Sequence, residues 1–434
     1  MNKIILLVMI ALLLPVYSYA QQGIKVNDYT LDNGLKVIII EEHKAPVATF
    51  QIWYKVGARN ESSYVTGVSH MLEHMMFKGT KKYAANVLST TVSRNGGIDN
   101  AFTTKNYTVY YETLPSDRIN IALQFESERM RGLLLDDKEL ASEKQVVIEE
   151  RRMRTDDNPQ NLLSEEVYAA AFKAHPYHNP VIGWMSDIES YKRSDLMEYY
   201  QAFYSPDNAF VIIAGDVNSA ALIGDIKKSF GEISNVPRKY KTPASEPAQN
   251  GERRVVLRKK AELPYMLMAF HAPSAPNADS YALDVLAGIL EGKSGRFYRD
   301  IIEKGIAVNA DTQYDSLSPD PDLLAFGGSV GQGQDIKNLE AAFNQEIKRL
   351  KTELTSGSDI QKVINQIEAS FIKEQDSSST VGMTIGAFEI LGDYKMKDKY
   401  IDNIKKVSSE DIKRVAIKYL TDDNKTVGVL EPIK

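Results

Sequence analysis

The feature that most constrains the fold is a regular alternation of strand-like and helix-like segments along the chain. Residues 34–42 and 47–56 are rich in β-branched and aromatic side chains, as β-strands are. Residues 65–80 instead repeat apolar side chains at helical spacing. A polar stretch with three prolines, residues 236–254, interrupts the alternation and is predicted to be an interdomain linker.

The segments on the two sides of this linker are predicted to form similar domains, residues 21–235 and 255–434. Residues 203–216 (FYSPDNAFVIIAGD) resemble residues 419–432 (YLTDDNKTVGVLEP). Each has the pattern of a helix end, an Asp-Asn turn and a buried strand. We therefore expect an α+β fold with two homologous α/β sandwich domains, in which a mainly antiparallel sheet is backed by helices.

Composition excludes several classes of protein. The 434 residues are 43% hydrophobic and 25% charged, which is typical of a globular protein with a large core. The formal net charge of −6 is spread along the chain, and a nucleic-acid-binding protein would normally carry a basic stripe. The absence of cysteine excludes disulfides and thiolate chemistry.

The first residues have the pattern of a secretory signal peptide. Lys3 provides a positive start, residues 4–16 are apolar, and small residues precede a cleavage site that we place after Ala20. An uncleaved membrane anchor is the alternative, but the apolar run is short for a span and contains Pro15. We expect residues 1–20 to be removed and the mature chain to be periplasmic or secreted, with no stable membrane span.

The stretch SHMLEHMMF, residues 69–77, holds two of the six histidines of the chain. On a helix, His70 and His74 lie one turn apart on the same face, so both imidazoles can reach one ion. Glu73 lies beside them and can reach a water molecule on that ion. Two histidines with an adjacent carboxylate indicate a zinc hydrolase, in the reversed order His-x-x-Glu-His. The alternative is two ordinary hydrogen-bonded histidines.

The faint repeat predicts that only the first domain carries this site. Aligning Asn208 with Asn424 in the repeat gives apolar counterparts to all three polar residues of the motif. These counterparts are Leu286, Ile289 and Leu290. A domain with leucine and isoleucine at these positions would bury them as core and would not bind metal.

A catalytic zinc usually has three protein ligands, so another side chain is required. The remaining histidines are not well placed in the sequence, and we interpret them as structural: His43, His175, His178 and His271. The helical segment 138–154 is richer in candidates. Glu143 and Glu150 are seven residues apart and share one face, whereas Glu149 points about 100° away. The pattern alone leaves the choice among these acids open.

Several segments resemble the pitrilysin (insulinase) family. Residues 57–80 (GARNESSYVTGVSHMLEHMMFKGT) are similar to its active-site segment, in the short branch that includes the mitochondrial processing peptidase β-subunit and bacterial relatives. Residues 96–111, 143–159, 175–184 and 204–216 resemble further family segments in the same order. The resemblance extends over nearly the whole mature chain and implies that the chain forms half of a hollow clamshell.

The resemblance also implies roles for individual residues. It makes His70, His74 and Glu150 the ligands of one Zn²⁺ per chain, with Glu73 as the general base of a zinc-activated water. Glu143 is similar to a family residue that supports the ligands. The chain is thereby expected to be an exported zinc metalloendopeptidase that hydrolyses peptides or unfolded protein segments.

The strand that follows Gly96-Gly97 resembles the substrate-binding edge strand of the family. An extended peptide would add to such a strand through main-chain hydrogen bonds. By this resemblance Asn100, Ala101 and Phe102 bind substrate, with the first two near the scissile bond. A plain edge strand without this role is the alternative.

One part of the family pattern is missing. Members with a complete site carry an Arg and a Tyr in the second domain, which help to hold substrate and stabilise the oxyanion. Ile302 and Val308 stand at these positions here. We expect a homologous subunit to supply the pair in a heterodimer, and otherwise a homodimer. Substitution by Arg296 or Arg299 is a weaker alternative.

Two features of the sequence are compatible with other functions. Residues 287–294 (AGILEGKS) nearly match a phosphate-binding loop, but such a loop follows a strand and opens a helix, whereas the preceding residues have helical periodicity. A non-catalytic or partner-dependent scaffold subunit of a peptidase complex is the second alternative. The intact histidine–glutamate motif favours the enzyme over the scaffold.

Overall fold

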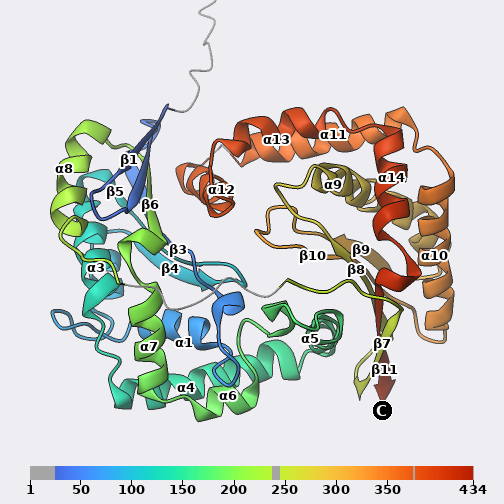
Figure 1. Cartoon of the computed structure of the whole chain (residues 1–434), viewed down its shortest axis with the longest axis horizontal. Coiled ribbons are helices and arrows are strands. Elements are labelled where there is room, and N and C mark those ends of the chain that lie inside the picture. Colours follow the sequence, from blue (N-terminus) through green and yellow to red (C-terminus); the bar gives the residue numbers. More distant parts are fainter. Residues whose placement is uncertain (1–24, 237–244, 375–376, 434) are drawn as a thin grey trace, which may run out of the picture.

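The computed structural model describes residues 25–236, 245–374 and 377–433, which form two sheets with helices around them (Figure 1). The α+β class with two similar, mainly antiparallel halves is confirmed. The expected signal peptide, residues 1–20, lies outside the described residues, as do residues 237–244 of the expected linker.

The first sheet has the strand order β1-β2-β6-β3-β5-β4, in which only the β2–β6 pair is parallel. The sequence pattern predicted a single strand after Gly96-Gly97, and this prediction was wrong. Residues 98–115 form a hairpin instead, because the Thr104 hydroxyl accepts hydrogen bonds from the backbone N–H groups of Asn106 and Tyr107 and closes a turn. The strands are β1 Lys25–Thr30, β2 Lys36–Glu41, β3 Val47–Tyr54, β4 Ile98–Thr103, β5 Thr108–Pro115 and β6 Ala209–Gly215.

The second sheet repeats this topology without a counterpart of β1. Its order is β7-β11-β8-β10-β9, and its one parallel pair is β11–β7. The strands are β7 Arg253–Lys260, β8 Tyr265–Ala272, β9 Asn309–Gln313, β10 Asp322–Ser329 and β11 Lys425–Ile433. The shared topology agrees with the faint sequence repeat.

Most helices pack on one face of the sheet in their own half of the chain. The helices of the first half are α1 Val68–Met75, α2 Val87–Arg94, α3 Asn120–Gly132, α4 Asp137–Arg151, α5 Pro159–Ala171, α6 Met185–Ser190, α7 Arg193–Phe203 and α8 Ser219–Phe230. Those of the second half are α9 Asp279–Leu290, α10 Ile336–Thr352, α11 Gly357–Lys373, α12 Ser378–Ile390, α13 Met396–Ile404 and α14 Ser409–Tyr419. A five-residue π-helix, Arg152–Asp156, continues α4.

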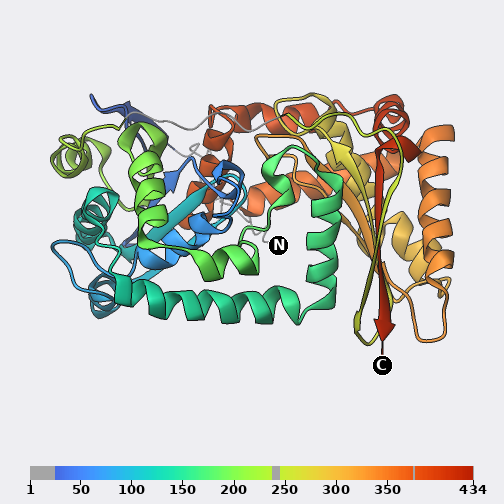
Figure 2. The same ribbon diagram turned by 60° about the horizontal axis from the view of Figure 1, so that its bottom comes forward.

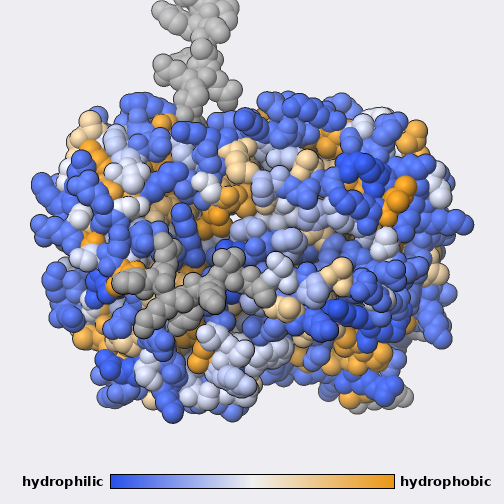
Figure 3. Space-filling view, viewed as in Figure 1, coloured by the Kyte–Doolittle hydropathy of each residue, from blue (hydrophilic) through white to orange (hydrophobic). Residues whose placement is uncertain are grey.

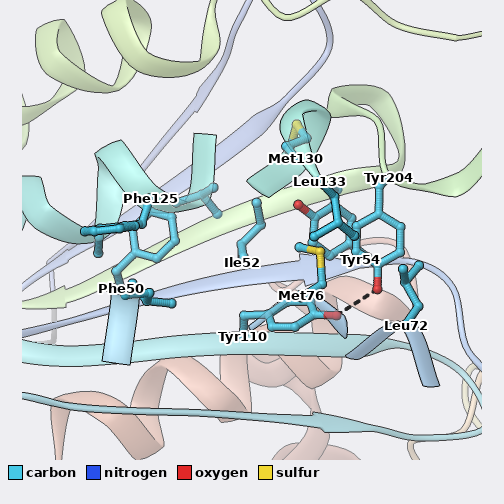
Figure 4. Close-up of a cluster of buried hydrophobic side chains, with 14 of the residues drawn as sticks. Phe50, Ile52, Tyr54, Leu72, Met76, Tyr110, Phe125, Met130, Leu133 and Tyr204 are labelled. Atoms are coloured by element: carbon cyan, nitrogen blue, oxygen red, sulfur yellow. Dashed lines mark hydrogen bonds between the residues drawn. The ribbon is translucent and has the colours of Figure 1, made fainter. Parts of the chain in front are cut away.

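The core of the first half fixes the position of α1 (Figure 4). Leu72 lies within α1, and Met76 lies just past its end. Both side chains are fully buried and pack among residues of β3 and β5. Tyr110 and Tyr204 share a hydrogen bond of 2.9 Å between their hydroxyl groups within this core. The apolar side of α1 therefore faces the sheet, and its polar residues are left to face outward.

Two helices pack on the sheet of the opposite half. Helix α5 covers one face of the second sheet, and α12 covers the remaining face of the first sheet (Figures 1 and 2). The approach is close, because a Cβ at Gly386 of α12 would overlap the Trp53 side chain, and one at Gly428 of β11 would overlap Val167 of α5. The domain bounds 21–235 and 255–434 remain a prediction, since the halves exchange these two helices.

Hydrophilic side chains predominate on the face of the molecule shown in Figure 3, and hydrophobic ones are mostly scattered. None of the helices formed by residues 25–236, 245–374 and 377–433 combines the length and the hydropathy that a bilayer span requires. The near-match to a phosphate-binding loop begins inside α9, whose last residue is Leu290. It therefore closes a helix, opposite to the arrangement that phosphate binding needs.

Candidate metal centre

Helix α1 presents His70 and His74 on its outer side and is held at its start by a buried carboxylate. Glu61 accepts hydrogen bonds from the backbone N–H groups of Gly67 (2.6 Å) and Ser69 (2.9 Å). These N–H groups belong to the first turn, which has no partners within the helix, so Glu61 acts as its cap. Burial raises the pKa of Glu61 to about 7.

Helix α4 crosses beside α1 and brings Glu150 to the two histidines. Glu150 Oε1 lies 3.7 Å from His70 Nε2, and Glu150 Oε2 lies 3.4 Å from His74 Nε2. One ligand atom from each of the three residues falls within 4.8 Å of the others. Zinc bonds of about 2.0–2.1 Å in a tetrahedron separate ligand atoms by about 3.3 Å, so these side chains fit a zinc ion.

Glu143 supports His74 from behind. His74 Nδ1 donates a hydrogen bond to Glu143 Oε1 at 2.9 Å, and Lys78 Nζ lies 2.6 Å from the second carboxylate oxygen. Fixing the proton on Nδ1 leaves Nε2 as the ligand atom, which faces Glu150. His70 has no such support among the described residues, because its Nδ1 is buried without a hydrogen-bond partner.

The two imidazoles have opposite protonation tendencies. Burial, with the nearby His74, lowers the pKa of His70 to about 4, so its lone pair is free at neutral pH. Burial also opposes the charging of His74, but hydrogen bonds to Glu143 and Glu150 outweigh it and raise the pKa of His74 to about 9. The hydrogen bond from His74 lowers the pKa of Glu150. The cluster thus favours one positive charge at its centre, which a metal ion can supply in place of the His74 proton.

Glu73 points from α1 toward the edge strand β4. The Thr103 hydroxyl donates a hydrogen bond of 2.5 Å to Glu73 Oε2, which leaves Oε1 as the oxygen without this bond. Burial raises the pKa of Glu73. The Glu73 carboxylate lines the same cavity as His70, His74 and Glu150 but does not converge with their ligand atoms.

The cluster opens into a cavity of about 520 Å³. Asn100, Ala101 and Phe102 line one side of it, and they belong to β4, which pairs with β5 alone among the described strands. The free edge of β4 therefore borders the cavity. The residues to which the family resemblance gives a role at the site thus line one space, while the substrate-binding role of the three β4 residues remains a prediction.

The other histidines and acids that were considered as metal ligands lie away from this cavity. Glu149 is exposed and pairs with Arg152 at 3.6 Å. His43 contacts Asp216, and His271 contacts the Ala171 carbonyl. Among the described residues, no second group of three metal-ligating side chains converges as the His70 cluster does.

Sequence reasoning missed three side chains at the site: Thr103, Lys78 and Arg154. Lys78 and Arg154 follow His74 and Glu150 by four residues, so helical spacing could have found them. Thr103 carried no such signal, because its contact with Glu73 depends on how β4 lies against α1.

In the second half, Ile302 and Val308 occupy the positions where the family pattern has Arg and Tyr. Val308 is about half exposed, and Arg296 is buried, with its guanidinium against the Thr355 hydroxyl. Burial inside the second half makes Arg296 a poor substitute for the missing arginine.

The two halves share one strand order, and one of them carries three side chains that converge as the ligands of a zinc ion would. Residues 36–184 match the family description "Insulinase (Peptidase family M16)", and residues 190–367 match "Peptidase M16 inactive domain". The zinc protease PqqE of Helicobacter pylori is 32% identical over 412 residues, which cover 93% of this chain and 92% of that protein. The chain belongs to peptidase family M16, the insulinase family.

Two further comparisons agree with this membership. A probable mitochondrial-processing peptidase subunit beta of Arabidopsis thaliana is 25% identical over 416 residues, 93% of this chain and 78% of that protein. The crystal structure of a protease from Helicobacter pylori aligns with a TM-score of 0.89 at 31% identity, covering 94% of this chain and all of the other. The resemblance inferred from the sequence motifs is therefore confirmed.

The support that Glu143 gives to His74 leads to a testable prediction. Glu143→Gln should weaken zinc binding by about 10- to 100-fold, because a neutral amide oxygen accepts the His74 hydrogen bond more weakly than a carboxylate and no longer raises the basicity of the imidazole. Competition with a chromophoric zinc chelator measures the affinity. Glu149→Gln, on the exposed side of the same helix, is the control and should bind zinc as the unmodified protein does. Equal affinity of both variants would refute the support role.

Proposed function

We propose that the chain is an exported zinc metalloendopeptidase for peptides or unfolded protein segments. The observation that carries this proposal is the convergence of His70, His74 and Glu150 beside Glu73, in a cavity bordered by a free strand edge. Membership of a family whose named relatives are zinc proteases supports the proposal.

His70, His74 and Glu150 would hold one zinc ion. When bound, the ion supplies Lewis-acid chemistry, which lowers the pKa of a water molecule and polarises a peptide carbonyl. Glu73 Oε1 accepts the proton of the attacking water and returns it to the leaving nitrogen. Thr103 holds the other oxygen of this carboxylate and thereby fixes the direction in which Oε1 points.

The substrate would bind as an added strand along β4. Its main chain pairs with the free edge near Asn100 and Ala101, and Phe102 lies on the same stretch. Such pairing reads the backbone more than the side chains, so the mode fits broad sequence tolerance. It also requires an extended peptide, which excludes folded regions of a protein substrate.

A homologous partner completes the site in this proposal. Ile302, Val308 and the buried Arg296 support it, because the second half offers no exposed Arg/Tyr pair at the family positions. A heterodimer is preferred and a homodimer is the alternative. The signal-peptide pattern of residues 1–20 supports a periplasmic or secreted location.

A non-catalytic or partner-dependent scaffold subunit remains the second candidate. The absence of Arg and Tyr at positions 302 and 308 favours the scaffold function. The complete set of metal ligands together with Glu73 favours the enzyme. The two functions differ in whether any peptide is cleaved at this site.

The deciding experiment assays a quenched fluorescent peptide with the chain alone and with a homologous chain from a neighbouring gene. We expect cleavage that a chelator abolishes and added Zn²⁺ restores, with the higher rate in the presence of the partner. Equal rates with and without the partner would refute the partner requirement. Cleavage that survives complete metal removal would refute the zinc mechanism.

A further inference from the structure

Arg154 lies at the metal centre, one turn beyond Glu150 on the π-helix that continues α4. Its guanidinium is 2.8 Å from Glu150 Oε1, the oxygen that faces His70 Nε2. The side chain borders the same cavity as Glu73 and the edge strand. It is 75% exposed, whereas the Glu150 side chain is only 15% exposed.

The surroundings leave this guanidinium with unused hydrogen-bond donors. Its one ion pair among the described residues is with Glu150, and a guanidinium carries five N–H donors. The neighbouring arginines are engaged away from the cavity: Arg151 is buried against Glu165, and Arg152 pairs with Glu149. When a metal ion shares the Glu150 carboxylate, Arg154 loses part of this counter-charge and gains affinity for another anion.

The second cation that lines the cavity, Lys78, is less able to bind an added anion. Lys78 is largely buried, and its ammonium is held 2.6 Å from Glu143, behind His74. Arg154 is the cavity's exposed cation. A stabilising role is a poor explanation for it, since the guanidinium end of this pair is exposed to water, which weakens the attraction between two residues four apart in the chain.

We propose that Arg154 is a specificity-determining residue that binds a carboxylate of the substrate, on an acidic side chain close to the scissile bond. The inference rests on the proposed function, because it assumes a peptide lying along β4 across the metal ligands. An arginine can bind a carboxylate through two parallel hydrogen bonds, which gives direction as well as attraction. The site would then prefer acidic peptides within the broad tolerance that backbone pairing allows.

The test compares quenched peptides that differ only by Glu or Gln at each position flanking the cleaved bond. We expect the unmodified protein, with zinc and any required partner, to show a kcat/KM about 10-fold higher for Glu at one of these positions, mainly through KM. In Arg154→Gln this ratio should fall to about 1, and Arg154→Glu should prefer Lys at that position. Arg152→Gln, in the same turn but paired with the exposed Glu149, is the matched control and should keep the ratio.

A binding arm separates this proposal from the proposed function. The affinity of the Glu73→Gln protein for the same peptides, measured by fluorescence anisotropy, reports on carboxylate recognition without turnover. If no peptide is cleaved, the proposed function fails, and the binding ratio still decides the role of Arg154. Equal binding of Glu and Gln peptides, or a ratio unchanged by Arg154→Gln, would overturn the proposal. Loss of zinc from Arg154→Gln, measured by metal analysis, would overturn it too, because Arg154 would then maintain the metal centre.

Discussion

Glu73→Gln should lower kcat for peptide hydrolysis by about 10²- to 10⁴-fold, the range that a positioned general base contributes. Glutamine has nearly the same shape and can still accept the hydrogen bond from Thr103. It cannot take a proton from water at neutral pH. The three ligand side chains are unchanged, so zinc content should stay at one ion per chain. Steady-state kinetics on a quenched peptide and metal analysis of the same sample measure both quantities.

The control for Glu73→Gln is the same substitution at a glutamate that lies outside the cavity. Glu149→Gln provides it, because Glu149 is exposed on the far side of α4. Its kcat should equal that of the unmodified protein. Substantial turnover by Glu73→Gln at full zinc content would show that another group is the base.

Arg129→Met should lower the free energy of unfolding by about 3–5 kcal/mol, the cost of removing one partner from a buried ion pair. Arg129 and its partners Glu112 and Glu126 are each no more than 2% exposed at the side chain. The guanidinium also lies over the rings of Phe77 and Tyr110, 4.9 and 4.8 Å from their centroids. Its removal leaves two carboxyl groups in the core without a counter-charge, and burial raises the pKa of Glu112 well above its ordinary value. The urea midpoint and its slope measure the loss.

The matched control removes all three charges together. The combination Glu112→Gln, Glu126→Gln and Arg129→Met leaves no unpaired charge, so it should recover most of the stability. If Arg129→Met alone costs less than about 1 kcal/mol, the cluster does not stabilise the fold in the way its burial indicates. Phe77 lies two residues past the end of α1, so Arg129 contacts the segment that follows the helix of the two histidines.

The parts of the site that depend on local geometry could be predicted from the sequence. His70 and His74 share a face because any helix places residues four apart together, whatever packs around it. The same spacing reduced the third ligand to a few acids on one segment. It could not select Glu150, because the choice depends on how α4 crosses α1, and no local pattern encodes that crossing. The family resemblance, and not the periodicity, predicted the residue that the structure brings to the histidines.

The fold was predictable to a similar depth. Alternating segments and the faint repeat indicated two similar halves, and the strand orders of the two sheets agree with that. The exchange of α5 and α12 could not be foreseen, because an apolar stripe shows that a helix is covered but not by which sheet. The hairpin at residues 98–115 was missed because its turn depends on the hydroxyl of Thr104 and not on Gly or Pro.

The corner between α4 and α5 has a mechanical consequence. Glu150 lies near the end of α4, and after the π-helix the chain turns at Pro159 into α5, which packs on the second sheet (Figure 2). The two histidines lie on α1, anchored in the first sheet. Val147 and Ile148 hold α4 in the same core as α1, so the ligands from both helices are anchored in the first half, and the chain leaves for the second sheet only beyond Glu150.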